Sequence, residues 1–156
     1  MDPKLKAFLD LIAFSEGTST HPLTKNQGYD VIVTGIHGPA IFFNYLDHPF
    51  AHGGYVLVRE MPLLMSTAAG RYQILAKWWK AYQTQLELKD FSPQSQDAVA
   101  LRQIEERSAL RMIETGDIQS AITACSNIWA SFPGNTYGQG GKSMEVLLAK
   151  YQILLG

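Results

Sequence analysis

The sequence predicts an α+β fold that is mostly helical and carries a small antiparallel β-sheet after its first helix. Apolar residues recur at three- and four-residue spacing from Leu5 to Ile12 and through most of the chain after residue 70, as in amphipathic helices. Between residues 29 and 62, short runs rich in Val, Ile and Tyr are bounded by glycine and proline, as strands are. The 156 residues, 46% apolar and 17% charged, fit one globular domain, residues 1–156.

The first helix is predicted to begin after Asp2 and to end at Gly17. Asp2 suits the N-cap and Pro3 the first helical position, while glycine readily adopts the left-handed conformation that closes a helix. Glu16 would then lie in the last turn, on the continuation of the face that carries Leu9 and Ile12.

The β subdomain is placed at about residues 28–65, with two or three short strands. Residues 28–33 and 55–58 have strand composition, and Gly38 with Pro39 interrupts the pattern between them.

The rest of the chain is predicted to be helical. One helix covers residues 70–86, with Tyr72 and Trp79 at helical spacing, and Ser92 with Pro93 opens another. Residues 109–113 form a short turn before Gly116. Asp117 caps a helix that runs towards Trp129, and Ser143 caps the last one.

Composition and motifs exclude several classes of function. The net charge of −1 gives no bulk attraction to nucleic acid, and no apolar run is long enough for membrane insertion. His48 and His52 are four residues apart, but Pro49 argues against a shared helix face, so we expect no metal site. No nucleotide-binding fingerprint is present, and no cofactor is expected. Cys125 is predicted to be a buried small hydrophobe.

Glu16 is the candidate for chemistry. The carbonyl end of a helix disfavours an anion, and an inward-facing carboxyl is further disfavoured as a charge. A carboxyl whose pKa is raised in this way can serve as a general acid. The other interpretation is an ordinary helix-end glutamate in solvent.

Seven runs, in order along the chain, resemble the lambda-type phage endolysins. They are AFLD at 7–10, SEGT at 15–18, GYDVIV at 28–33, AGRYQ at 69–73, KDFSP at 89–93, SQDAVAL at 95–101 and CSNIWAS at 125–131. The resemblance covers residues 6–139 and implies a lysozyme-like fold with a cleft between two lobes.

The resemblance also implies a peptidoglycan lytic transglycosylase. Such an enzyme cleaves the β-1,4 bond between N-acetylmuramic acid and N-acetylglucosamine without adding water, and leaves 1,6-anhydro-muramic ends. Glu16 stands at the family's single catalytic glutamate. The same resemblance places Asp30, Ser66, Tyr72, Gln73 and Tyr137 among the substrate-binding residues.

Simpler roles for these residues stay open at this point. Residues 70–73 could be a helix N-terminus with a solvated Arg71, Tyr137 a loop anchor, and Asp30 a hydrogen-bond acceptor at a turn or strand end. The glycine-rich residues 134–141 are interpreted as a lip over the cleft. Residues 34–65 are longer than the family pattern leads us to expect, so the opposite lip should differ.

Two other functions remain alternatives. A hydrolytic muramidase would use a second carboxylate, such as Asp30, Asp47 or Glu60, to orient water. A non-catalytic module would only bind glycan. For the leading hypothesis we expect a monomer. We also expect it to be made in the host cytoplasm, because no signal peptide is visible. A membrane-permeabilising partner, a holin by analogy with the family, would release it to the periplasm and cell wall, where its partner is the peptidoglycan glycan strand.

Overall fold

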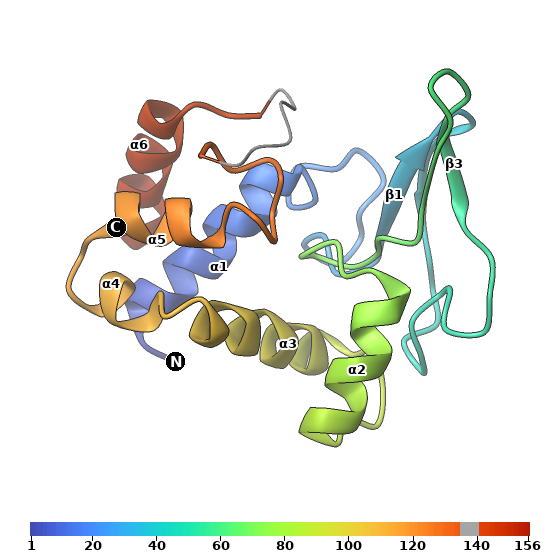
Figure 1. The fold of residues 1–156 in the computed structure, drawn as a ribbon, viewed down its shortest axis with the longest axis horizontal. Helices are drawn as coiled ribbons and strands as arrows, with labels where there is room; N and C mark the ends of the chain where they lie inside the picture. The colour runs from blue at the N-terminus through green and yellow to red at the C-terminus, as the bar shows by residue number, and fades with distance from the viewer. Residues whose placement is uncertain (135–140) are drawn as a thin grey trace. The chain divides into compact units, whose positions relative to one another are not determined.

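The computed structural model describes residues 1–134 and 141–156. The chain consists of two compact units. The first, the helical unit, consists of residues 1–16 and 100–156, and the second, the sheet unit, of residues 17–99. The described residues form helices together with two small antiparallel sheets, which confirms the predicted mostly helical α+β class (Figure 1).

The helical unit packs around its N-terminal helix. α1 (Pro3–Glu16) contacts α4 (Leu110–Glu114) and α6 (Met144–Leu155), and α5 (Ile118–Cys125) contacts both of these helices. Phe8, Leu9 and Ile12 of α1 are buried, as the spacing predicts, and Leu11 is buried as well. Figure 1 shows α1 running beneath α5 and α6.

The predicted caps of this unit are confirmed. The Asp2 carboxylate accepts from the Lys4 N–H at 2.8 Å, and the Asp117 carboxylate accepts from the Ser120 N–H at 3.2 Å. The Ser143 hydroxyl accepts from the N–H of Val146 at 3.2 Å and so caps α6. Each cap satisfies a backbone donor that has no partner inside its helix.

The predicted extension of α5 towards Trp129 is wrong, because the helix ends at Cys125. The Ser126 backbone N–H and hydroxyl both donate to the carbonyl of Thr123, which tightens the chain into a turn. Cys125 is fully buried, as predicted, and burial raises the pKa of its thiol to about 12. It is therefore a poor nucleophile.

The sheet unit contains two separate two-stranded antiparallel sheets. β1 (Val31–Gly35) pairs with β2 (Gly38–Ile41) in the register Val31 to Ile41. β3 (Val56–Arg59) pairs with β4 (Leu64–Ser66) in the register Val56 to Ser66. Both ladders shift register near the turn, which marks a bulge in each hairpin.

The predicted strand boundaries need three corrections. Tyr29 and Asp30 belong to a turn, so the strand predicted at residues 28–33 begins later, at Val31. Gly38 and Pro39 do not break the pattern but open β2, since proline is tolerated in an edge strand. The strand β4 lies in an apolar stretch and was missed, because Leu64 and Met65 are exposed and give no inward and outward alternation.

The helix predicted to begin at residue 70 begins six positions later, as α2 (Ala76–Leu86). Residues 70–73 form a turn in which Gly70 and Gln73 have positive φ angles of 85° and 51°. The chain then pairs Ala69 with Ile74 in an isolated bridge. Trp79 of α2 is fully buried, with its ring 4.9 Å from that of Phe91. The adjacent Trp78 points elsewhere on the helix and is 49% exposed.

The remaining helix, α3 (Pro93–Glu106), begins at the predicted Ser92 and Pro93. The Ser92 hydroxyl accepts from the Ser95 N–H at 3.3 Å. Among the described helices, none combines the length and hydropathy that crossing a bilayer requires.

Candidate active site

Glu16 is the last residue of α1, and Gly17 follows it with a φ of 77°. The left-handed glycine ends the helix directly after the glutamate. Glu16 is half-buried. The interpretation of this residue as an ordinary glutamate in solvent is therefore wrong.

A short chain of hydroxyl groups holds the Glu16 carboxyl. The Ser131 hydroxyl donates to Glu16 Oε2, and the Ser15 hydroxyl donates to the Ser131 oxygen at 2.8 Å. Ser15 is itself buried, with 5% exposed. Because the Ser131 hydroxyl accepts from Ser15 while it donates to Glu16, the bond from Ser15 strengthens the one from Ser131.

A lysine completes this group within the helical unit. Lys142 Nζ donates to the backbone carbonyl of Ser15 at 3.1 Å and lies 5.0 Å from the centre of the Phe14 ring. Lys150 Nζ lies 4.9 Å from the same ring. The ammonium groups of Lys142 and Lys150 thus lie near the same aromatic ring, that of Phe14. Lys142, which is bonded to α1, is the one close to Glu16.

The electrostatics of Glu16 are a balance in which burial dominates. Removal of water disfavours the carboxylate and raises the pKa of Glu16 above its usual value. The Ser131 hydroxyl, the charge of Lys142 and the Ser131 backbone each favour the carboxylate and lower the pKa, but they do not cancel the effect of burial. Glu16 therefore keeps its proton to a higher pH than an ordinary glutamate does. The groups that stabilise its carboxylate also help it to release that proton.

Asp30 is also buried, with 4% exposed, and its carboxylate is occupied. It accepts from the Thr24 hydroxyl and, at 2.9 Å, from the Lys25 N–H. These bonds close the loop before β1. Asp30 is thus the turn acceptor that the sequence allowed as an alternative, and a part in substrate binding stays a prediction.

Tyr72 lies in the core of the sheet unit with 1% exposed. Its hydroxyl donates to Asp97 Oδ1 at 2.6 Å, and the Tyr29 hydroxyl donates to the same oxygen at 2.8 Å. Arg71 is 7% exposed, and its guanidinium carbon lies 5.2 Å from the centre of the Tyr29 ring. The alternative of a helix N-terminus with a solvated Arg71 is therefore wrong on both counts.

Gln73 and Ser66 are partly accessible, and both make local bonds. Gln73 Nε2 donates to the carbonyl of Gly70 at 2.9 Å, which leaves the Gln73 carbonyl oxygen as the atom that could accept from a sugar hydroxyl. The Ser66 hydroxyl accepts from the Ala68 N–H at 3.1 Å, and its own proton can still be donated. Tyr137 lies outside the described residues.

The other carboxylates considered for hydrolysis are differently placed. Asp47 accepts from the Trp79 indole N–H at 2.9 Å and from the His48 N–H at 2.8 Å, so it has a structural task. Glu60 is exposed at the β3–β4 turn. His48 is buried, with Nε2 2.7 Å from the carbonyl of Ile74. Among the described residues, no group of three metal-binding side chains comes together.

Ser131 and Lys142 are the residues that sequence reasoning missed. Both lie more than 100 positions from Glu16 in the chain, with a separation of 115 residues between Ser131 and Glu16. Neither has a local pattern that indicates chemistry. The one signal was that Ser131 ends the matched run at residues 125–131.

Comparison with known proteins gives a consistent result. A family model described as Endolysin matches residues 6–156. The endolysin of Escherichia phage P2 is 54% identical over 153 residues, covering 97% of this chain and 93% of that protein. The endolysin of Escherichia phage lambda is 56% identical over 148 residues, covering 94% of this chain and 88% of that protein.

Solved structures agree. The lysozyme of bacteriophage lambda, in a complex with a chitohexasaccharide, superposes with a TM-score of 0.91 at 53% identity, covering 100% of this chain and 96% of that one. A second structure of the lambda lysozyme gives a TM-score of 0.85 at 50% identity, covering 99% and 95%. The resemblance and the lysozyme-like fold inferred from the sequence are confirmed, and the chain belongs to the endolysin family.

Proposed function

We propose that this endolysin is a peptidoglycan lytic transglycosylase that lyses the bacterial host of a phage. It cleaves the β-1,4 bond between N-acetylmuramic acid and N-acetylglucosamine and closes a 1,6-anhydro ring on the muramic residue. The observation that carries the proposal is Glu16, a half-buried carboxyl whose pKa is raised by burial while a hydroxyl and a nearby cation prepare it to become an anion.

The reaction needs one group that first gives and then takes a proton. Protonated Glu16 donates to the glycosidic oxygen, and the bond from C1 to that oxygen breaks. The resulting Glu16 carboxylate then accepts the proton of the C6 hydroxyl as O6 attacks C1. The nucleophile belongs to the same sugar, so proximity replaces a second catalytic group. Glu16 ends protonated, as it began.

The surroundings of Glu16 suit each half of this cycle. Burial favours the acid at the start, and the Ser131 hydroxyl together with Lys142 stabilises the carboxylate that forms when the leaving group departs.

The substrate is assigned from the relatives. A glycan, chitohexasaccharide, occupies the related lambda lysozyme. We infer that Ser66 and Gln73 contact the glycan in this chain through the two polar atoms identified above. Asp30 would act by holding the loop before β1 and Tyr72 by holding the turn that carries Gln73, and Tyr137 is proposed as a further contact.

The mass of the products tests the mechanism. Purified peptidoglycan digested by the wild type should yield anhydro-muramic ends, lighter by one water than the ends that hydrolysis leaves. Glu16→Gln should lower the rate by about 100- to 10,000-fold, the usual contribution of a general acid and base. Products that carry an added water would favour the hydrolytic muramidase, and unchanged lysis by Glu16→Gln would remove Glu16 from its role.

The route to the substrate is also part of the proposal. The enzyme would be made in the host cytoplasm, act as a monomer without a cofactor and reach the periplasm through a holin-type partner. Expression in the cytoplasm with and without a co-expressed holin, followed by turbidity, would test this route. Lysis at the same rate without the holin would contradict it.

A further inference from the structure

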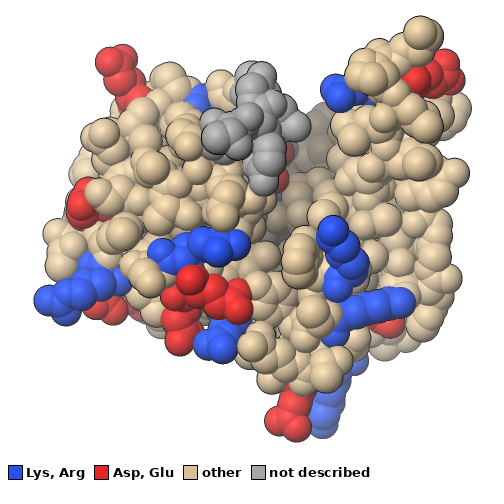
Figure 2. All heavy atoms as spheres, in the orientation of Figure 1, with Lys and Arg blue, Asp and Glu red and all other residues tan. Residues whose placement is uncertain are grey.

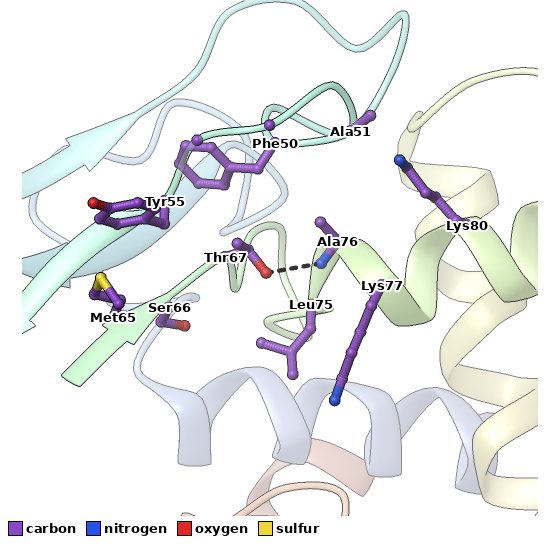
Figure 3. Close-up of a pocket in the computed structure, with 12 residues that line it drawn as sticks. Phe50, Ala51, Tyr55, Met65, Ser66, Thr67, Leu75, Ala76, Lys77 and Lys80 are labelled. Atoms are coloured by element: carbon purple, nitrogen blue, oxygen red, sulfur yellow. Dashed lines mark hydrogen bonds between the residues drawn. The ribbon is translucent and has the colours of Figure 1, made fainter.

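The sheet unit contains a hollow of about 550 Å³, and Ser66 is the one residue of its lining that the proposed reaction also uses. It lies between the loop before β3, the strand β4 and the start of α2 (Figure 3). Its lining includes Phe50, Met65, Ser66, Leu75, Lys77 and Lys80.

The interior of this hollow is mainly apolar and is held by the backbone. The side chains of Phe50, Met65 and Leu75 line it, and Figure 3 shows them around one space. The Thr67 hydroxyl accepts from the Ala76 N–H at 3.0 Å, which ties the start of α2 to the segment after β4. The walls therefore come from elements that are fixed to one another within the unit.

The rim on the α2 side is cationic. Lys77 and Lys80 lie one helical turn apart, both exposed, and Figure 3 shows their side chains leaving α2 in different directions beside the hollow. In the part of the chain that the structure describes, neither lysine takes part in an ion pair. Basic side chains stand over α2 in the space-filling view (Figure 2). The charge at this rim is thus available to an anionic ligand.

An apolar floor beside two such cations selects a ligand with small apolar groups and carboxylates. The glycan strand of peptidoglycan does not fit that description, because its sugars are neutral where the lactyl group is joined to the peptide. The stem peptide does fit, since it combines alanine methyl groups with free carboxylates. Attraction between the lysine ammonium groups and the peptide carboxylates would orient such a ligand and strengthen its binding at this partly apolar site.

We propose that this hollow, with Lys77 and Lys80 at its rim, binds the anionic stem peptide of peptidoglycan. The proposal rests on peptidoglycan being the substrate, but it does not depend on whether the bond is cleaved with or without water. It gives the enzyme a preference for glycan that still carries its peptides.

Matched substrates test the preference. The wild type is compared on peptidoglycan and on the same strands after an amidase has removed the stem peptides. The double variant Lys77→Gln/Lys80→Gln should lower the rate on stem-bearing strands by about three- to tenfold, the range expected for two exposed ion pairs, with little effect on stripped strands. The double variant Lys89→Gln/Arg111→Gln removes the same charge elsewhere and should leave both rates unchanged.

A second pair of variants tests the hollow itself. Met65→Glu places a negative charge in it, while Met61→Glu places the same charge on the exposed β3–β4 turn, where Met61 is 90% exposed. Met65→Glu should reproduce the loss on stem-bearing strands, and Met61→Glu should not. Equal losses on stem-bearing and stripped strands, for either pocket variant, would overturn the proposal.

Direct binding separates this proposal from the proposed reaction. The free tetrapeptide L-alanyl-γ-D-glutamyl-meso-diaminopimelyl-D-alanine is titrated into the wild type and followed by NMR at residues of the hollow. Binding that weakens with salt, and that is lost in Met65→Glu and in the amidated peptide, would support the site even if the products proved hydrolytic. No binding to the wild type, or binding of chitooligosaccharide in place of the peptide at Leu75, Lys77 and Lys80, would overturn it.

Discussion

At the scale of single residues, the chemistry depends on a carboxyl under opposing influences. Burial raises the pKa of Glu16, whereas Ser131 and Lys142 lower it. Neither influence alone would serve the reaction, because an acid that never ionises cannot take the second proton. The effect of Ser131 and of Lys142 on the pKa of Glu16 should therefore be measurable through the pH dependence of activity in variants that leave the burial of Glu16 unchanged.

Ser131→Ala should move the alkaline limb of the activity profile to higher pH. Without the hydroxyl that donates to Glu16 Oε2, the carboxylate is less stable and the pKa rises further. A hydrogen bond to a charged group contributes about 1.5–3 kcal/mol, equivalent to roughly one to two pH units. Ser15→Ala, one bond further away, should move the limb in the same direction by less. A limb that stays in place, measured as kcat/KM against pH, would contradict this role.

Lys142→Gln should also move the alkaline limb to higher pH, because the positive charge of Lys142 lowers the pKa of Glu16. Lys150→Gln is the matched control: its ammonium lies at the same Phe14 ring but is not among the groups that shift Glu16. Added salt should shrink the difference between Lys142→Gln and wild type, since screening weakens the interaction. Equal shifts in the two lysine variants would assign the effect to the ring instead.

At the scale of elements, the turn at residues 70–73 shows how tightly the sheet unit is built. The Gly70 N–H donates to the Val31 carbonyl at 2.7 Å, and the next N–H, of Arg71, donates to Gln96 Oε1 at 2.9 Å. The Gln96 amide group also donates to the carbonyls of Tyr29 and Phe91. One fully buried glutamine thus joins this turn to three other segments of its unit.

Gly70→Ala should therefore be far more destabilising than Gly116→Ala. Both glycines have a φ of 85°, so both substitutions carry the same backbone strain, about 1–2 kcal/mol. A Cβ on Gly70 would meet Gln96 Oε1 at 2.3 Å, whereas nothing lies within 4 Å of one on Gly116. The overlap should add about 1–3 kcal/mol. Urea unfolding of the two variants measures this difference, and equal losses would show that the turn relaxes freely.

Sequence reasoning succeeds where the signal is local. The caps Asp2, Asp117 and Ser143 sit within three residues of the N–H groups they satisfy, so the starts of their helices could be predicted. The start of α2 could not, because the apolar spacing before Ala76 is produced by a turn whose bonds reach Val31 and Gln96. Tertiary contacts override periodicity there.

The site follows the same division. Glu16 could be found because a helix end and an apolar face are both visible in the sequence around it. Ser131 and Lys142 could not, since their approach to α1 depends on how the helical unit packs. The roles of residues in the sheet unit were harder still. Asp30 and Tyr72 match the family pattern, yet their polar atoms are occupied by internal partners.

At the scale of the whole molecule, the cost of holding Glu16 ready for chemistry falls on global stability. A carboxyl whose pKa is higher in the folded than in the unfolded chain binds a proton more readily when folded. Its contribution to stability is therefore fully present below the unfolded pKa and is lost as pH rises through the folded pKa. At neutral pH the buried carboxylate opposes folding, which is a common feature of functional sites.

Glu16→Gln should accordingly make the protein more stable than wild type at neutral pH, although it slows catalysis. Glutamine can keep a hydrogen bond with Ser131 but carries no charge to desolvate. Urea unfolding from about pH 4 to about pH 8 should show a gain that grows with pH and vanishes at the acid end, by about 1.4 kcal/mol for each unit of raised pKa. Glu114→Gln, on an exposed residue, controls for the loss of one negative charge. If Glu16→Gln were no more stable than wild type at neutral pH, burial would not be the cause of the raised pKa, and the acid role of Glu16 would have to rest on some other contact.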